Sequence, residues 1–329
     1  MKKKYIISSF ILTTLFCIFL FLCILDSFIH KTELTKNGMI DPSIWGQFGD
    51  IIGGVIGTIF ALLSSLLIIF TLLYQIKSFK IQEIENRFFQ LLLIHRENVN
   101  EIEDKRKFFK NVIDTFWEIR DFVDECYESN LENYDITKEN QYQFDSFERS
   151  NIAYLILFFG TDLVKNDNLK DRICSMSYCS VLITDVLNKL DELNISTKNN
   201  LDIKEGIQYA LGHYFRHLFQ TVNYINDCKK KLNFKKKYSY IKTLRSQLST
   251  YEQMLLYINS ISKLGLEWEN SIDNWNENLI TKYNLIKNIP LGCMKDIEPN
   301  DIYILVQFEN MYQDELDQIL ATRKKLDFK

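Results

Sequence analysis

The stretch "GQFGDIIGGVIG", residues 46–57, decides the architecture, because it holds five of the chain's eleven glycines and opens a long uncharged run. Glycine is a poor helix former in water, at about 1 kcal/mol worse than alanine. In lipid, by contrast, small residues let two helices pack closely, and such packing replaces the missing hydrophobic drive. We therefore expect this helix to lie in a membrane.

Two uncharged runs near the N-terminus are long enough to cross a bilayer. Residues 5–25 and 51–76 both reach the roughly 20 residues that about 30 Å of hydrocarbon requires. A cleaved signal peptide is the alternative for the first run, but its apolar core would be only about 7 to 15 residues long and would end at a small-x-small site. The first run is longer and ends at Asp26 without such a site. We expect two transmembrane helices joined by the loop 26–50.

Basic residues predict the orientation of these helices, since Lys and Arg are retained on the cytoplasmic side of short flanks. Three lysines at 2–4 precede the first run, and Lys77, Lys80 and Arg87 follow the second. The loop between the runs has fewer basic than acidic residues. We expect both termini in the cytoplasm and the loop outside.

Small residues recur every four positions at the start of the second run. They are Gly49, Gly53, Gly57, Ala61 and Ser65. On one helix they form a single, slowly drifting stripe. The stripe could receive the first span of the same chain or join copies into a homo-oligomer, and the sequence leaves both readings open. A phosphate-binding loop is not supported, because neither GxGxxG nor a following Gly-Lys-Ser/Thr is present.

The rest of the chain is typical of a helical domain. No proline occurs from 43 to 289, and 47% of all residues are hydrophobic, which is ample for a core. The second span should continue into a cytoplasmic helix, followed by a loop over 129–143. Further helices are expected over 107–128, 147–159 (a buried one), 170–193, 204–230, 238–264 and 267–286. The predicted fold class is all-α, with a transmembrane hairpin over 1–77 and a helical cytoplasmic domain over 78–329.

The charge of the cytoplasmic part argues against general nucleic-acid binding, because acidic residues outnumber basic ones there. One local exception is "KKKLNFKKK", with the lysines Lys229, Lys230, Lys231, Lys235, Lys236 and Lys237. We expect a solvated turn between two helices, with anionic lipid headgroups or nucleic acid as alternatives. The seven cysteines form no CxxC pair and show no zinc-ligand spacing, so no cofactor is expected.

Two amphipathic stretches carry the candidate polar residues. In "GHYFRHLFQTVNYI", 212–225, an apolar arc lies opposite His213, Arg216 and His217. In "YIKTLRSQLSTYEQMLLYINSI", 240–261, Arg245 and Glu252 border the apolar arc. Because a buried unpaired charge is costly, we expect these two helices to pack as a hairpin that turns at the lysines, with Arg216 or His213 against Glu252.

A metal site on the first of these stretches is weakly supported. His213 and His217 have the i, i+4 spacing of a helical metal pair. However, "HYFRH" lacks the glutamate of HExxH, and the sequence offers no evident third ligand. A polar helix face is the favoured interpretation.

These motifs together resemble the phage abortive infection proteins, the AbiC-like family of bacterial defence proteins. The resemblance is carried in order by "WGQFGDIIGGVIGTIFALLS", "FFQLLLIHRENV" at 88–99, "GHYFRHLFQTVNYI" and "LRSQLSTYEQMLLYIN" at 244–259. It covers most of the chain except about 107–200. It implies a multi-pass protein of the bacterial cytoplasmic (inner) membrane that kills or arrests an infected cell. It brings no established set of catalytic residues.

The resulting expectation is a membrane effector rather than an enzyme. The cytoplasmic domain would sense a phage-derived trigger or a neighbouring defence protein, and the hairpin would disturb the lipid bilayer. Two alternatives remain: a membrane-tethered toxin that acts on RNA, and a non-catalytic scaffold that recruits a defence partner. HEPN ribonucleases carry an arginine, four to six residues and then a histidine, and the absence of this pattern weakens the first alternative.

Overall fold

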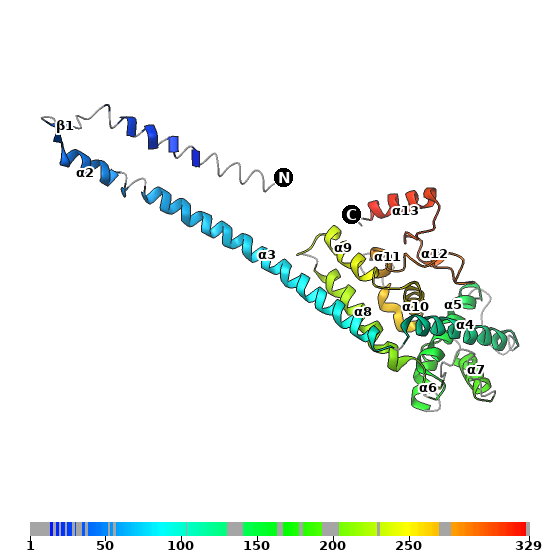
Figure 1. Cartoon of the computed structure of the whole chain (residues 1–329). Helices are drawn as coiled ribbons and strands as arrows, with labels where there is room; N and C mark the ends of the chain where they lie inside the picture. The colour runs from blue at the N-terminus through cyan, green and yellow to red at the C-terminus, as the bar shows by residue number, and fades with distance from the viewer. Residues whose placement is uncertain are drawn as a thin grey trace. The chain divides into compact units, whose positions relative to one another are not determined.

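The structure is a computed structural model whose described residues form two compact units. They are 14–15, 18–19, 21–23, 25–27, 30, 35–36, 39–51, 53–54, 57–102, 104–129, 141–162, 167–177, 180–192, 204–228, 231–269 and 278–326. The first unit covers residues 1–80 and the second covers residues 81–329. Apart from one pair of two-residue strands, every regular element in the described residues is a helix (Figure 1). The all-α fold class is therefore confirmed.

The first unit has more regular structure before the second uncharged run than the sequence suggested. Its elements are β1 (Thr35–Lys36), β2 (Met39–Ile40), α2 (Pro42–Ile51) and the first part of α3 (Gly57–Asn100). The two strands pair antiparallel. Pro42 takes the first position of α2, where a missing N–H has no consequence, and the Asp41 carboxylate accepts a hydrogen bond from the Ser43 amide at 2.9 Å. The predicted loop 26–50 thus contains a strand pair and most of a capped helix.

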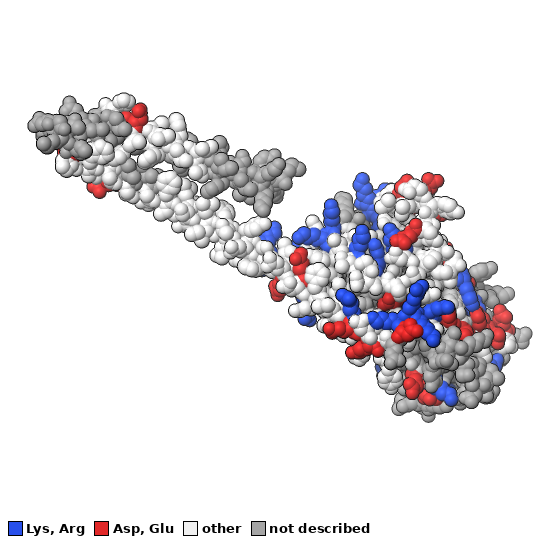
Figure 2. Space-filling model, viewed as in Figure 1, with Lys and Arg blue, Asp and Glu red and all other residues white. Residues whose placement is uncertain are grey.

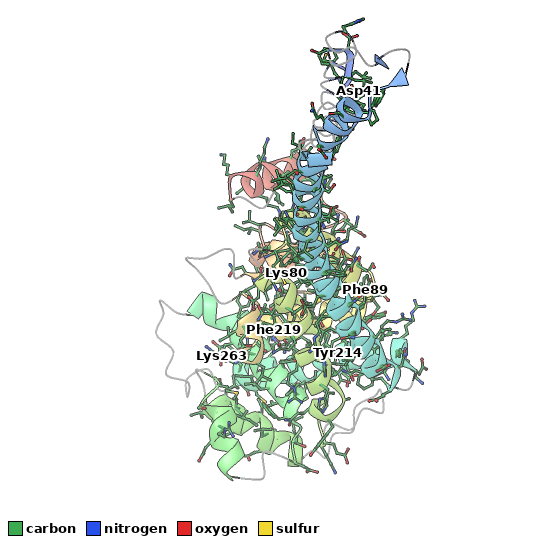
Figure 3. All side chains as sticks on the ribbon, turned by 90° about the vertical axis from the view of Figure 1, so that its left-hand side faces the viewer. Asp41, Lys80, Phe89, Tyr214, Phe219 and Lys263 are labelled. Carbon is green, nitrogen blue, oxygen red and sulfur yellow. The ribbon has the colours of Figure 1, made fainter. Side chains whose placement is uncertain are left out.

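Helix α3 is 44 residues long and is shared by both units. Lys80, the last residue of the first unit, and Phe89 both lie on it (Figure 3). Among the described residues, α3 is the one helix long and apolar enough to cross a membrane. It begins at Gly57 instead of the predicted residue 51. The predicted first span, 5–25, lies largely outside the described residues, so the two-helix hairpin is not confirmed.

The stripe of small residues does not lie on one α-helix. Gly49 lies on α2, Gly53 lies in a π-type turn, and Gly57, Ala61 and Ser65 lie on α3. A π-type turn contains more residues than an α-helical turn, so the four-residue period does not continue as one line through it. A Cβ built on Gly49 or Gly53 would meet nothing within 4 Å among the described atoms. Close packing inside the chain is therefore not seen at these two glycines.

The second unit is built around the central parts of two helices, which are buried on every side. Its elements after α3 are α4 (Lys105–Ser129), α5 (Gln141–Phe159), α6 (Asp167–Cys174), α7 (Ser180–Glu192), α8 (Gln208–Asp227), α9 (Phe234–Arg245), α10 (Thr250–Ile261), η4 (Lys263–Trp268), α11 (Leu279–Tyr283), α12 (Pro299–Ile302) and α13 (Gln313–Lys325). Residues 150–157 of α5 and 252–260 of α10 are all buried. A helix without an exposed face belongs in a core. The prediction of a buried helix at 147–159 is confirmed.

The predicted hairpin is confirmed for α8 and α9, but its second helix is broken. Helices α8 and α9 are in contact, and the turn between them falls at the lysine cluster. A capping box then starts a new helix, α10: Ser249 Oγ accepts from the Glu252 amide at 3.3 Å, and Glu252 Oε2 accepts from the Ser249 amide at 2.8 Å. The prediction of one helix over 238–264 is therefore wrong.

Two other predicted helices are also divided. The range 170–193 contains the end of α6 and then α7. The range 267–286 contains the end of the 3-10 helix η4 and the five-residue α11. Helix α11 stops at Asn284, whose φ of 53° is left-handed and cannot continue a right-handed helix.

Two facing glycines join the end of α5 to the start of α8. Gly160 and Gly206 both have positive φ, 77° and 67°. A Cβ on Gly206 would lie 2.5 Å from the Gly160 amide nitrogen and 2.7 Å from the Phe158 carbonyl oxygen. The two backbones can approach this closely only without side chains. The approach fixes the first turn of α8 against the buried helix α5.

Gly206→Ala should destabilise the second unit strongly, because it adds left-handed strain of about 1–2 kcal/mol to a clash with backbone atoms that cannot move aside. Gly212→Ala is the matched control, since its Cβ would meet only side-chain atoms at 3.9 Å within α8. In the control, alanine should be neutral or stabilising by up to about 1 kcal/mol. Thermal unfolding of the purified full chain measures both, and equal melting temperatures for the two variants would refute the close approach.

Candidate functional site

Helix α8 separates an apolar face from a polar one, as the sequence predicted. Leu211, Tyr214, Leu218 and Val222 are buried. His213, Arg216 and Gln220 are exposed, and His217 is half-buried. Because residues three and four apart share a face of a helix, the exposed side chains form one continuous strip. Open cavities border this strip on both sides.

The larger cavity, which we name the α8 groove, has a volume of about 880 Å³. The ends of α5 and α6, the first part of α8 and the 3-10 helix η4 form its walls. Aromatic rings line much of it, among them Phe159, Phe219 and Trp268, and Arg172 and Arg216 add two guanidinium groups. Such a lining, apolar with a few polar groups, is typical of a ligand-binding surface.

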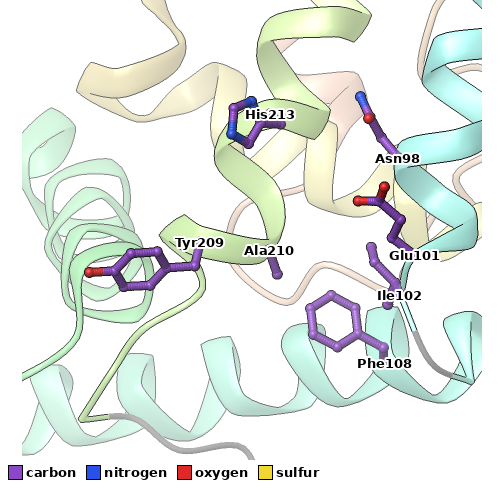
Figure 4. Close-up of a pocket in the computed structure, with 7 residues that line it drawn as sticks. All are labelled: Asn98, Glu101, Ile102, Phe108, Tyr209, Ala210 and His213. Atoms are coloured by element: carbon purple, nitrogen blue, oxygen red, sulfur yellow. The ribbon is translucent and has the colours of Figure 1, made fainter.

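A second cavity, of about 610 Å³, lies between the end of α3 and the start of α8. Figure 4 shows Asn98, Glu101 and Ile102 facing the side of α8 that carries Ala210, while the ring of Tyr209 is directed away. His213 borders both this cavity and the α8 groove. The polar strip of α8 therefore links the two cavities.

Glu252 is buried, but its partners differ from those predicted. The hydroxyl of Tyr214 donates to Glu252 Oε1 at 3.2 Å, and Ser249 Oγ and its amide donate to Oε2 at 2.7 and 2.8 Å. The expected pairing with Arg216 or His213 is wrong. Arg216 instead bonds to the Gly212 carbonyl and lies 3.3 Å from His213 Nδ1 on the exposed face. Sequence reasoning missed Tyr214 as a polar partner because it assigned the ring to the apolar arc.

Arg245 is also buried, and it binds carbonyl oxygens. Its Nη1 donates to the carbonyls of Tyr283 and Asn284 at 3.2 and 2.8 Å, at the C-terminal end of α11. Arg323 of α13 donates to the carbonyls of Thr281 and Lys282 at the same helix end. The last carbonyls of a helix lack partners within the helix and carry partial negative charge, so cations bind favourably there. The predicted network of five residues is therefore divided between an exposed strip, a buried Tyr–Glu contact and the end of α11.

The lysine cluster is not one solvated patch. Lys231, Lys235 and Lys236 are exposed. Lys237 is buried, and its ammonium group donates to the Asn226 carbonyl at the end of α8 at 2.6 Å. Lys229 and Lys230 lie outside the described residues. The interpretation as a solvated turn is wrong for Lys237. Successive residues of helix α9 point in different directions, so Lys237 faces the core while Lys236 faces solvent.

Sequence reasoning did not single out His95, which completes the buried polar site. His95 lies on α3, is only 2% exposed, and its ring centroid is 5.0 Å from that of Tyr214. Within the described structure its Nδ1 has no hydrogen-bond partner. Burial, together with the nearby His217, lowers the pKa of His95 to about 4. Among the described residues, no group of three metal-binding side chains is found.

The depressed pKa of His95 predicts a loss of stability in acid. Unfolded histidine titrates near pH 6.5, so between about pH 6.5 and 4 the unfolded chain binds more protons and stability falls as pH falls. The His95 contribution should drop by about 2 kcal/mol from pH 7 to pH 5. His95→Phe keeps the ring contact with Tyr214 but cannot titrate. Chemical unfolding at the two pH values should show a smaller acid loss for this variant, and an identical loss would contradict the assignment.

Residues 206–294 match a family model described as "Putative phage abortive infection protein". The matched segment runs from Gly206 through α8, α9, α10 and α11. Neither the curated proteins nor the solved structures contain a match to the chain. The family match supports a role in phage defence. Over residues 206–294 the chain is thus similar to the phage abortive infection proteins.

Proposed function

We infer that this protein is a membrane-anchored effector of phage defence. In this proposal the helical domain receives the infection signal, and the apolar part of α3, together with the uncharged run 5–25, disturbs the bilayer. The lysine distribution favours the bacterial cytoplasmic membrane with both termini inside. A phage-derived trigger or a neighbouring defence protein remains the proposed partner, and the small-residue stripe remains the proposed contact between copies.

One observation carries the proposal: the first part of α3 exposes many large apolar side chains and no charged one. Those at least two-fifths exposed are Ile59, Phe60, Leu62, Leu66, Leu67, Ile68, Ile69, Phe70, Leu72, Leu73, Tyr74 and Ile76. Figure 2 shows this part of the helix almost free of charged side chains on the face in view. Water-soluble proteins rarely leave so much contiguous apolar surface uncovered. The uncharged part of α3, residues 57–76, is 20 residues long, which matches the thickness of a bilayer core.

The second part of α3 has a different environment, because it belongs to the folded helical unit. Ile84, Phe88 and Leu92 are buried there at a spacing of four. Phe88 also packs on Tyr240 of α9, with ring centroids 5.2 Å apart, and Tyr240 donates a hydrogen bond to Glu85 at 2.5 Å. Tyr240 lies within the family-matched segment. A single helix thus contains both the apolar run and the residues that contact this segment.

Ile68→Lys should release the protein from membranes. A lysine near the middle of a membrane span raises the free energy of insertion by about 3 kcal/mol. Leu93→Lys is the matched control, because Leu93 is 54% exposed and lies on the same helix within the second unit. After an alkaline carbonate wash, wild type and Leu93→Lys should stay in the membrane pellet. Release of both variants, or of neither, would count against lipid contact at Ile68.

The effector mechanism is tested by membrane potential in cells induced to express the protein. A potential-sensitive dye should report collapse within minutes for wild type and for Leu93→Lys, before any loss of ribosomal RNA. Ile68→Lys should leave the potential intact. Cleavage of RNA while the potential is maintained would overturn the membrane mechanism and favour the RNA-directed toxin.

A further inference from the structure

A third cavity, of about 600 Å³, lies where α3 ends, α4 begins and α10 begins, and we name it the α10 cavity. Its wall includes His95 and Val99 of α3, Phe109 of α4 and Tyr251 of α10. The parts of α3, α4 and α10 that line the cavity all belong to the second unit. The Tyr214–Glu252 contact described above borders it, since Glu252 is also part of the wall.

The charge around this cavity is unbalanced. Arg96, Lys105 and Arg106 all line it. Glu252 is the one carboxylate in the lining, and both of its oxygens already accept hydrogen bonds from Tyr214 and Ser249. Within the described structure, none of the three cations forms an ion pair, and Lys105 bonds only to the neutral amide of Asn100. An anion would therefore meet three available donors.

His95 supplies an independent indication that this cavity binds a polar ligand. A buried polar group without a hydrogen bond is unfavourable by about 1–3 kcal/mol, and native structures contain few of them. The His95 ring forms part of the cavity wall, and its Nδ1 has no partner among the described residues. A polar ligand in the cavity would give His95 Nδ1 a hydrogen-bond partner.

The size and lining of the cavity indicate more than a bare inorganic ion. Val99, Phe109 and Tyr251 provide apolar and aromatic surface beside the cations. Guanidinium groups bind phosphate through paired N–H donors, and aromatic rings stack on planar organic groups. We propose that the α10 cavity binds a phosphate ester, with the phosphate held by Arg96, Lys105 and Arg106 and the organic part against Phe109 and Tyr251.

Such a ligand would join three helices, because its phosphate contacts the end of α3 and the start of α4 while its organic part contacts α10. Occupancy would therefore stabilise the end of α3, the helix that also carries the exposed apolar run. Regulation of the membrane activity by this ligand, through the end of α3, is the one part of the inference that rests on the proposed function. Binding itself is measured separately, so either claim can fail while the other stands.

The test is calorimetric titration of the full chain in phosphatidylcholine nanodiscs, with pyrophosphate and ATP as probes in phosphate-free buffer. A third arm adds vesicles containing phosphatidic acid, which presents the same chemistry as a lipid headgroup. Saturable binding in any arm is expected to weaken at least tenfold in the double variant Arg96→Gln, Arg106→Gln. Preference for ATP would identify a free phosphate ester, and preference for the vesicles a lipid.

Two further variants keep the result interpretable. Lys235→Gln with Lys236→Gln removes the same charge from an exposed part of α9 and should change affinity less than twofold. Val99→Phe narrows the cavity without altering charge and should weaken ATP more than pyrophosphate. Absence of saturable binding in every arm would overturn the proposal. Equal weakening by the two double variants would also overturn it, because it indicates nonspecific attraction.

Discussion

The contact between the last turns of α3 and the helical unit is the constraint on which the rest depends. Ile84, Phe88, Leu92 and His95 form one buried line along that part of the helix. Among the described residues, nothing covers the earlier part of α3 in this way, and its apolar side chains are exposed. A backbone in hydrocarbon must satisfy its own hydrogen bonds, which a continuous helix does. One regular element can therefore serve both lipid and the protein core.

Within the family-matched segment, two buried cations donate hydrogen bonds to carbonyls at helix ends. Arg245 binds carbonyls at the end of α11, and Lys237 binds a carbonyl at the end of α8. The attraction within a buried ion pair often fails to offset the free energy lost when both charges are desolvated. Carbonyls at a helix end, by contrast, need hydrogen-bond donors in any case. The buried carboxylate, Glu252, is likewise satisfied by a capping box and a tyrosine hydroxyl. The polar groups thus define where the short helices begin and end.

Much of the architecture could be predicted from local patterns, and the site could not. Apolar periodicity was sufficient for α4, for the buried α5 and for the inner face of α8. The break before Thr250 has a local signal, since Ser249 and Glu252 have capping-box spacing. Sequence reasoning missed this signal because the apolar period continues through the stretch. The partners of Glu252 depend on Tyr214, which is 38 residues away and counts as apolar in a pattern. His95 lies more than 100 residues from Tyr214, so no local signal brings them together.

The central claim is that α3 has two environments, lipid for its first part and the folded unit for its second. The most direct measurement is the accessibility of nitroxide labels at positions 72 and 89, where Leu72 and Phe89 are both about half exposed. The labels would be introduced singly into full-length protein in bilayers, with the native cysteines replaced. The account predicts that the label at 72 collides with dissolved oxygen and is shielded from a water-soluble nickel complex, while the label at 89 shows the reverse. Equal access of the nickel complex to both labels would contradict it.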